Sequence, residues 1–532
     1  MRAPGRARAR VQGRARGPCR LGAVRPPRAP ASLALAALCL GAAPARAADP
    51  FEHVPLPVQG RPVQVFAVDP GAGARGADLV VVCVEGAPPD ERRHLWVLRA
   101  AALGAGGVGP ALRVPVPPEA VAFDLADLDP APGLEVVLLS RNGLEIVSPA
   151  APAARVVGRI SFSPPAPLPP RTRSFSRMRL VDDWSADGGV AAAVPSLEGA
   201  RLVRLDGASQ QTLELPIVTE YWTPQRGPPA YDGILEANLQ WPQLARADDD
   251  GDGRPDVFAL GRYGAAVFRA NGERLGPAPS RAMPLRPFSP EEELRPETTR
   301  ARLFARDLDG DGLGDLVVHR SSGTLLGSYA STEIHRNPGG GAELARPAEV
   351  RLEAGAGVAD VDLADLDGDG RVEVVQSLVS FGLVQVLRFL TTRRVEVELS
   401  VWALRPPGIS RAERVWQQAV ALPVDFGAGR VEGLLPTAEG DWNGDGRRDL
   451  LYGVGAGEIA IHLGAPLPAG PGFGERVASQ AIPPASWAVV ADVDGDGLDD
   501  LIVYDDFASE GVVHLLRNRG ILPGTQAGLR AP

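Results

Sequence analysis

The sequence predicts an all-β protein: a β-propeller of four-stranded blades, with eight blades preferred and seven as the alternative. Three observations support this fold class. An Asp- and Gly-rich segment recurs along the chain at intervals of 51 to 76 residues. Each copy is flanked by short apolar segments of strand length, and the chain has 62 glycines and 52 prolines, which favour tight turns. Tandem four-stranded units of this length are typical of propeller blades.

The repeated segment has five full copies. They share the pattern D-x-[DN]-G-D-G-x-x-[DE] followed by an apolar strand, and they begin at Asp248, Asp307, Asp365, Asp441 and Asp492. Three further copies keep only part of the pattern, and they begin at Asp69, Asp127 and Asp183. Together the eight copies fill the chain from residue 48 onwards.

The unit around Asp441 shows the strands expected within one blade. A short strand enters the loop, and three more are expected over 449–453, 457–464 and 475–482, separated by Gly-rich turns. The last unit has strands around Ala488, Leu501 and Val512 and then lacks a fourth. The segment Phe51–Val58 would supply this missing outer strand and close the ring, which removes the open edges of a linear array.

The Asp-rich loop and the strand that follows it resemble the FG-GAP/VCBS repeat. That repeat builds the propeller head of integrin α subunits and of many exported bacterial proteins, so the resemblance implies a calcium-binding propeller. It covers most of residues 48–532, although the literal Phe-Gly and Gly-Ala-Pro signatures are mostly absent. Because the first three copies depart from the pattern, metal is expected in the five full loops.

The spacing of the acids suits calcium, which takes six to eight oxygen ligands. Positions one, three, five and nine of each loop offer side-chain oxygens, and position seven offers a backbone carbonyl. The glycines at positions four and six allow positive φ angles. We therefore expect about five calcium ions, held by Asp248, Asp250, Asp252, Arg254 and Asp256; Asp307, Asp309, Asp311, Leu313 and Asp315; Asp365, Asp367, Asp369, Arg371 and Glu373; Asp441, Asn443, Asp445, Arg447 and Asp449; and Asp492, Asp494, Asp496, Leu498 and Asp500.

Two other interpretations of these loops are less consistent with the sequence. An EF-hand needs an acid at position twelve and flanking helices. Position twelve is instead Ala259, Val318, Gln376, Tyr452 and Val503, each in an apolar strand-like run. Solvated turns without a metal would also use Asp and Gly, but several carboxylates within nine residues repel one another unless a cation is present.

The N-terminus predicts export. Residues 1–30 contain nine arginines and no acid, an apolar stretch runs from Ala31 to Ala43, and Ala45–Ala47 forms an A-x-A cleavage pattern. We therefore divide the chain into a signal peptide, 1–47, and a propeller, 48–532. The apolar stretch is too short to span a membrane, so no transmembrane segment is expected after cleavage, and the protein is expected in the periplasm, at the cell surface or outside the cell.

Cleavage would change the charge and the cysteine content. Removal of ten arginines moves the formal net charge from −10 to about −20, which argues against nucleic acid and anionic membranes as partners. Cys83 becomes the sole cysteine, so no internal disulfide is expected, and its apolar surroundings predict a buried core residue. The protein is expected to be a monomer.

Motifs of catalysis are absent from the sequence. None of the six histidines stands in an H-E-x-x-H pattern, and there is no G-x-S-x-G elbow, phosphate-binding loop or C-x-x-C. We therefore expect a non-catalytic binding, adhesion or scaffolding protein, and the alternative is a polysaccharide lyase on the same scaffold. The ligand, protein or glycan, is not identified. Two insertions are candidate partner sites: Thr219–Gly233, and Phe381–Phe426, whose run from Val384 to Leu404 predicts a long hairpin.

Overall fold

The computed structural model describes residues 49–525 apart from short gaps, and these residues belong to one compact unit. The gaps are at 72–74, 88–89, 104–107, 129–132, 151, 171, 173–174, 185–188, 208, 216–217, 223–235, 273, 286–287, 290–298, 323–327, 340–346, 355–356, 381, 406–408, 426, 428–429, 456 and 508–511. The predicted signal peptide lies outside the described residues, so its cleavage remains a prediction.

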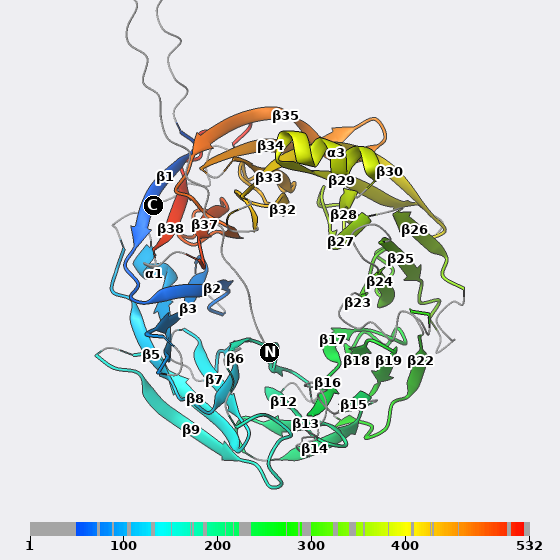
Figure 1. Cartoon of the computed structure of the whole chain (residues 1–532). Helices are drawn as coiled ribbons and strands as arrows, with labels where there is room; N and C mark the ends of the chain where they lie inside the picture. Colours follow the sequence, from blue (N-terminus) through cyan, green and yellow to red (C-terminus); the bar gives the residue numbers. More distant parts are fainter. Residues whose placement is uncertain are drawn as a thin grey trace, which may run out of the picture. The chain divides into compact units, whose positions relative to one another are not determined.

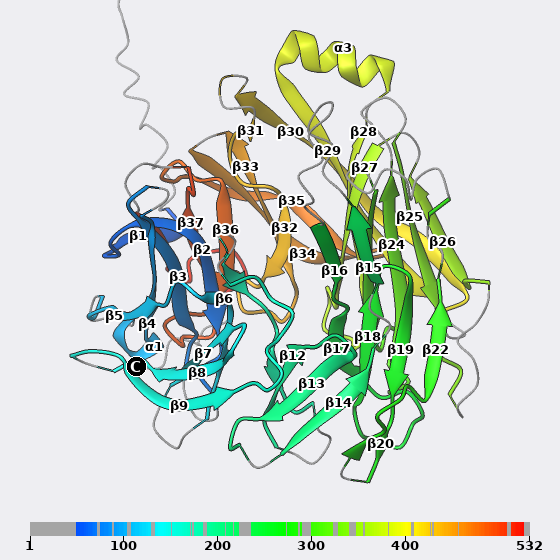
Figure 2. The same ribbon diagram turned by 60° about the horizontal axis from the view of Figure 1, so that its bottom comes forward.

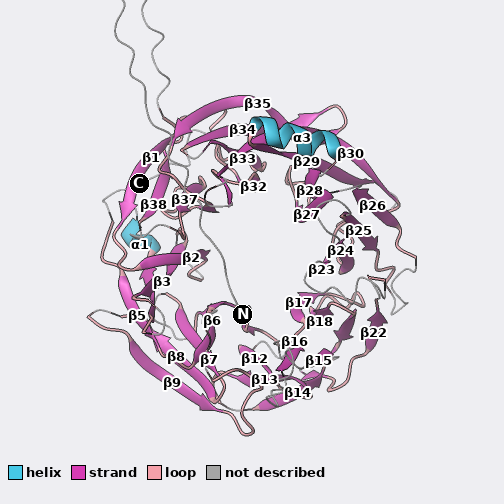
Figure 3. Cartoon of the chain, viewed as in Figure 1, coloured by secondary structure: helices cyan, strands magenta, loops and turns pink. Residues whose placement is uncertain are grey.

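Eight sheets of four or five strands form a closed ring in the described part of the chain (Figure 1). This confirms the all-β fold and the preferred number of blades. Within each blade the strands run antiparallel from the centre of the ring outwards, apart from β10, which lies parallel to β6. Figure 3 shows how little helix there is.

Each of the first four blades contains one copy of the repeat. They consist of β2 (Arg61–Val68), β3 (Asp78–Glu85), β4 (Arg92–Leu98) and β5 (Leu112–Val116); β6 (Ala120–Ala126), β7 (Glu135–Ser140), β8 (Gly143–Ser148), β9 (Arg155–Ser161) and β10 (Ser176–Arg177); β11 (Val181–Asp182), β12 (Ala191–Pro195), β13 (Gly199–Arg204) and β14 (Gln210–Glu214); and β17 (Gln243–Ala247), β18 (Asp256–Gly261), β19 (Gly264–Phe268) and β22 (Arg281–Pro284).

Blades five to eight complete the ring. They consist of β23 (Thr299–Arg306), β24 (Asp315–Ser322), β25 (Tyr329–His335) and β26 (Val350–Ala354); β27 (Gly357–Ala364), β28 (Glu373–Ser380), β29 (Arg394–Arg405), β30 (Arg411–Asp425) and β31 (Arg430–Val431); β32 (Thr437–Gly440), β33 (Asp449–Gly455), β34 (Glu458–Leu467) and β35 (Gly470–Ala481); and β36 (Trp487–Ala491), β37 (Asp500–Tyr504), β38 (Val513–Asn518) and β1 (Phe51–Leu56). The four strands expected around Asp441 are thus present.

The hydrophobic core lies between the blades. Each of the eight seams between neighbouring blades is filled by a cluster of buried apolar side chains from both sides. Alternate residues of the second strand in a blade serve opposite seams: Val80 and Val82 face blade two, whereas Leu79 and Val81 face blade eight. Burial on both faces explains why these strands are continuously apolar. Cys83 is fully buried there, as expected, and burial raises the pKa of its thiol to about 12.

The N-terminal strand closes the ring, as the sequence predicts. β1 pairs antiparallel with β38 over six residues, from Phe51 opposite Asn518 to Leu56 opposite Val513. Phe51 packs in the seam between blades seven and eight, and Leu56 packs in the seam between blades eight and one. The last blade is therefore built from both ends of the described chain, which lie side by side in Figure 1.

The long hairpin predicted from Val384 to Leu404 is wrong in its first half. Residues Leu383–Thr392 form the helix α3, and the hairpin begins only with β29 and continues into β30. Apolar residues at Val384, Leu387 and Leu390 fit a helical face as well as a strand, so the short apolar run was ambiguous. The helix ends at Arg393, which takes a left-handed φ of 55° and donates its N–H to the carbonyl of Phe389.

Two smaller elements complete the described fold. β15 (Val218–Trp222) and β16 (Glu236–Gln240) form a separate two-stranded hairpin, and the rest of the predicted insertion Thr219–Gly233 lies outside the described residues. A second small hairpin joins β20 (Ala270–Asn271) to β21 (Arg274–Leu275), and α1 (Ala100–Leu103) is a single turn. Among the residues described, no helix has the length and apolar character needed to cross a membrane.

Candidate metal centres

The five full loops occupy equivalent places in blades four to eight. Each connects the innermost strand of its blade to the second strand: β17 to β18, β23 to β24, β27 to β28, β32 to β33, and β36 to β37. The tight turn depends on glycines at positions four and six, which have positive φ in all five loops. In the first loop these values are 82° at Gly251 and 81° at Gly253. A residue with a Cβ would be strained at both positions.

The first Asp of each loop organises the turn. In the loop at Asp248, one carboxylate oxygen accepts the N–H of Gly251 at 2.7 Å, and the other accepts the N–H of Gly253 at 2.8 Å. The same pair of bonds is present in the four loops that begin at Asp307, Asp365, Asp441 and Asp492. Position five adds a bond from the amide of position seven, such as Arg254 N to Asp252 Oδ1 at 2.8 Å.

Position nine carries the most buried of the predicted side-chain ligands. One oxygen of its carboxylate accepts the amide of position two in every loop, for example Asp249 N to Asp256 at 2.9 Å. In four loops the other oxygen accepts an amide at or just beyond the third strand, for example Ala270 N at 2.8 Å. The acid therefore ties loop and sheet together, a structural role that the sequence pattern alone did not reveal.

This burial has an electrostatic consequence. Desolvation, reinforced by the other carboxylates of the loop, raises the pKa of Asp256 to about 6, those of Asp315, Glu373 and Asp449 to about 7, and that of Asp500 to about 8. The bonds from backbone amides oppose this increase. A fully ionised loop is therefore costly without a positive charge at its centre.

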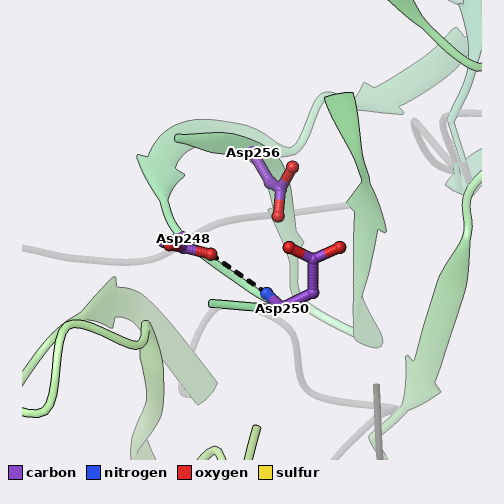
Figure 4. Close-up of side chains that lie close together, drawn as sticks. All are labelled: Asp248, Asp250 and Asp256. Atoms are coloured by element: carbon purple, nitrogen blue, oxygen red, sulfur yellow. Dashed lines mark hydrogen bonds between the residues drawn. The ribbon is translucent and has the colours of Figure 1, made fainter. Parts of the chain in front are cut away.

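Side-chain oxygens converge in four of the five loops. Three carboxylates offer atoms within 4.8 Å of one another in the groups Asp248, Asp250 and Asp256; Asp307, Asp309 and Asp311; Asp365, Asp367 and Glu373; and Asp492, Asp494 and Asp500. Figure 4 shows the first group, in which the carboxylates of Asp250 and Asp256 face each other beside Asp248. Positions one and three are common to all four groups, whereas the third member is position nine in three loops and position five in one.

Position three places a carboxylate oxygen without a described hydrogen-bond donor in three of the loops. Oδ1 of Asp309, of Asp367 and of Asp494 is buried and has no hydrogen-bond partner among the described residues. The side chains of Asp309 and Asp494 are only 7% and 9% exposed. A buried carboxylate oxygen without a donor is costly, and a cation held by the same carboxylates would remove that cost.

The loop at Asp441 differs from the others because position three is an amide. Asn443 is buried, and its Oδ1 accepts the amide of Asp445 at 3.2 Å. Its Nδ2 donates to the carboxylate of Asp445 at 3.1 Å. The described residues form no three-acid group here, so this predicted site rests on Asp441, Asp445 and Asp449 with the oxygen of Asn443.

Arginines next to the loops were missed by the sequence analysis. Arg336 reaches both Asp309 (2.9 Å) and Asp311 (2.8 Å), and Arg269 reaches Asp249 at 2.7 Å. Both arginines stand at or just beyond the end of the third strand of their blade, so only the paired fold brings them to the loop. They partly neutralise the acids and leave Oδ1 of Asp309 without a donor in the described chain.

The incomplete copies in blades one and three also have an arginine bound to their acids. In blade one, Asp78 takes the place of position nine, with one oxygen on Ala100 N and the other on Arg99 at 2.8 Å. In blade three, Arg246 bridges Asp182 (2.9 Å) and Asp183 (3.3 Å). Parts of the loops at Asp69, Asp127 and Asp183 lie outside the described residues. No three-acid group is found in the parts that are described.

Four of the five loops lie in segments that match a known repeat family. Residues 307–375 and 441–503 match the family described as the FG-GAP-like repeat. The chain carries FG-GAP-like repeats. The first match runs from the loop of blade five into β28, and the second runs from the loop of blade seven into β37. The resemblance seen in the sequence is thus confirmed, and the matched FG-GAP-like segments contain four of the five full loops.

Other comparisons are remote. No curated protein matches this chain. An Agrocybe aegerita lectin, described as recognising non-reducing terminal N-acetylglucosamine, is 14% identical with a TM-score of 0.35, over 86% of either chain. The Photorhabdus luminescens Tc holotoxin pore is 14% identical with a TM-score of 0.29, over 84% of this chain and 17% of that chain. The WD40 domain of Toxoplasma gondii coronin is 8% identical with a TM-score of 0.33, over 70% of this chain and 80% of that chain. Scores this low carry no argument about this chain.

Proposed function

We propose that this chain is an exported calcium-binding propeller that acts as a non-catalytic binding or scaffolding protein. Calcium would be a structural part of the five full loops. The observation that carries this proposal is the convergence of carboxylates around the buried, unpartnered Oδ1 atoms of Asp309, Asp367 and Asp494 within the described chain. The donors are all oxygens, which favours a hard cation and gives no reason to expect zinc.

When bound, calcium would supply positive charge and six to eight oxygen contacts at the centre of the loop. The residues of the loop have separate structural roles. Position one fixes the turn through its two glycine amides, and position nine anchors the turn to the second and third strands. Each filled loop would thus hold the first two strands of its blade in place, and in four blades the third strand as well. The single described cysteine forms no disulfide that could do the same.

Substitution of Asp250 and Asp252 by Ala tests the sites one at a time. At saturating calcium, the double variant should bind one ion fewer than the wild type and keep the other four, because each loop has its own ligands. Metal analysis of the purified protein measures this. Arg254→Ala is the matched control, since position seven would contribute only its carbonyl and the variant should keep all five ions. An unchanged count in the double variant would show that this loop is not a site.

For the partner site, we propose the exposed face of α3. Val384, Leu387 and Leu390 are 72%, 63% and 64% exposed on neighbouring turns of the helix. α3 follows β28 at the end of the blade opposite to the loop of 365–373, and it stands away from the sheets in Figure 2. The exposed Arg388, together with the aliphatic side chains, resembles the composition of protein interfaces more than the aromatic platforms that stack on sugars. A protein partner is therefore favoured over a glycan.

The double variant Leu387→Glu with Leu390→Glu tests this face. It should lose most of its binding, at least tenfold in affinity, because two charges would have to be desolvated in an apolar contact. The wild type and the variant are compared on the same arrays of purified exported proteins and of glycans. Gln385→Glu, an exposed change on the same helix, is the matched control and should bind normally. Equal binding by the wild type and the double variant would exclude α3 as the contact.

The lining of one described cavity gives the lyase alternative little support. This cavity has a volume of about 830 Å³ and opens among β23, β27 and β32. Its lining includes Arg306 and Arg448, but both side chains donate to backbone carbonyls, those of Leu363 and Glu439. The carboxylates of Asp362 and Glu439 also line it, and they would repel an acidic polysaccharide. We therefore retain the binding function.

A further inference from the structure

The five full loops are joined to one another by backbone hydrogen bonds across the seams of the ring. In each case the amide of position eight in one loop donates to the carbonyl of position one or two in the preceding loop. The bonds are Gly314 N to Asp248 O (2.7 Å), Val372 N to Leu308 O (3.1 Å), Arg448 N to Leu366 O (2.9 Å) and Asp499 N to Asp441 O (3.2 Å). We call this run of five bonded loops the loop arc.

The run of bonds stops at the blade-four end of the loop arc and continues past its blade-eight end. At the loop of blade four, position eight is Pro255, which has no amide hydrogen to donate to blade three, where the loop at Asp183 is incomplete. At the other end, Ala77 N donates to Asp492 O at 2.8 Å across the closing seam. Two side chains reinforce the arc: Asn337 Nδ2 bonds the carbonyl of Asp249 at 3.0 Å, and Asn518 Nδ2 bonds the carbonyl of Trp442 at 2.8 Å.

We propose that the loop arc couples the metal sites, so that the loops take up calcium cooperatively around the ring. This proposal rests on the proposed function, because it assumes that the loops bind calcium. Position eight lies between two predicted ligand positions, seven and nine. Its acceptor belongs to position one, whose side chain is a ligand, or to the adjoining position two. Each bond therefore links the backbone of one site to that of the next.

The physical basis is the shared cost of ordering the loops. An empty loop holds several carboxylates that repel one another, so its backbone is ordered only at a cost. Filling one loop fixes its position-eight amide and thereby holds the carbonyl of its neighbour in the filled geometry. The neighbouring loop then loses less conformational entropy when it binds calcium, so it binds the ion more tightly. Because coupling free energies are reciprocal, the effect runs in both directions along the arc.

Arg448→Pro is the direct test, since it removes the amide between the loops at 441 and 365. Proline fits position eight, because Pro255 occupies that place in the loop at Asp248, where the amide of Arg254 still bonds Asp252. Arg448→Ala is the matched control, because it removes the same side chain and keeps the amide. Calcium titrations should give a Hill coefficient above one for the wild type and for Arg448→Ala. In Arg448→Pro the Hill coefficient should be lower, and the calcium concentration at half-saturation should rise at least roughly fivefold.

Amide exchange provides a second measurement that does not depend on how well Arg448→Pro folds. Asp445→Ala impairs the loop at Asp441 and leaves every ligand of the loop at Asp365 in place. At subsaturating calcium, the amides of Gly368 and Gly370 should then exchange several-fold faster than in the wild type. The amides of Gly251 and Gly253, three loops along the arc, should change least.

The outcomes separate this inference from the function on which it rests. Five ions bound with a Hill coefficient of one, or identical isotherms for Arg448→Pro and Arg448→Ala, would overturn the coupling and leave the calcium sites standing. Unchanged exchange at Gly368 and Gly370 in Asp445→Ala would also overturn it. No calcium uptake by the wild type would instead overturn the proposed function itself.

Discussion

A chelator should lower the melting temperature of this protein by roughly 5–10 °C, and millimolar calcium should restore it. Sites of extracellular type bind calcium with Kd values of about 10⁻⁴–10⁻³ M. At ten times Kd, each site adds about 1.4 kcal/mol to the free energy of unfolding, because only the folded loop binds well. Five sites together would add about 7 kcal/mol, which is comparable to the whole stability of a typical domain.

The size of the shift follows from the size of the ring. Unfolding about 480 residues at about 2.1 cal/mol/K each gives an entropy near 1 kcal/mol/K, so 7 kcal/mol corresponds to about 7 °C if the ring unfolds as one unit. Cooperative uptake along the loop arc would change the calcium concentration at which the melting temperature rises. It would leave the melting temperature at saturating calcium almost the same. Thermal melts with chelator, calcium and magnesium measure the effect.

Magnesium is the control for this result. It demands a compact octahedral shell and keeps its waters, so it should restore little of the lost stability. The variant Asp250→Ala with Asp252→Ala should be less sensitive to the chelator than the wild type, by about one site in five. A melting temperature that the chelator does not change would refute the structural role of calcium and would indicate that these loops are turns without a metal.

Much of this structure could be predicted because the repeat recurs at a nearly regular spacing and each copy combines an Asp- and Gly-rich loop with an apolar strand. The eight spaced copies gave the blade count, and the apolar strands after each loop gave the second strand of each blade. The missing fourth strand after Val512 pointed to Phe51–Val58 as the closing segment. Each of these inferences depends on a local pattern or on counting the copies, and none of them requires knowledge of how the blades pack against one another.

The features that were missed depend on contacts between segments far apart in the sequence. Arg336 meets Asp309 only once β24 and β25 are paired, and Arg448 meets Leu366 only once blades six and seven lie side by side. α3 was missed for a local reason, because the apolar residues interspersed with polar ones over Leu383–Thr392 fit either period. The second role of position nine was hidden because one carboxylate can satisfy both a metal pattern and two backbone amides.

The closing strand should be the most sensitive part of the ring outside the loops. Phe51 is 1% exposed and meets Trp442 edge to face at 5.5 Å between ring centroids. Its backbone is held on both sides by Gln480, whose Oε1 accepts the Phe51 N–H at 2.8 Å and whose Nε2 donates to the Phe51 carbonyl at 3.0 Å. β1 therefore joins blade seven to blade eight as well as completing the sheet beside β38.

Phe51→Ala should cost about 3–5 kcal/mol in the free energy of unfolding, because it leaves a cavity in a closed seam. The loss should be accompanied by faster amide exchange along β38, whose outer edge depends on β1 for its partners. Denaturant titration and amide exchange measure the two effects. Glu52→Ala, an exposed change on the same strand, is the matched control and should cost less than about 0.5 kcal/mol. Equal stability of the two variants would show that the ring is held by its seams and loops without the closing strand.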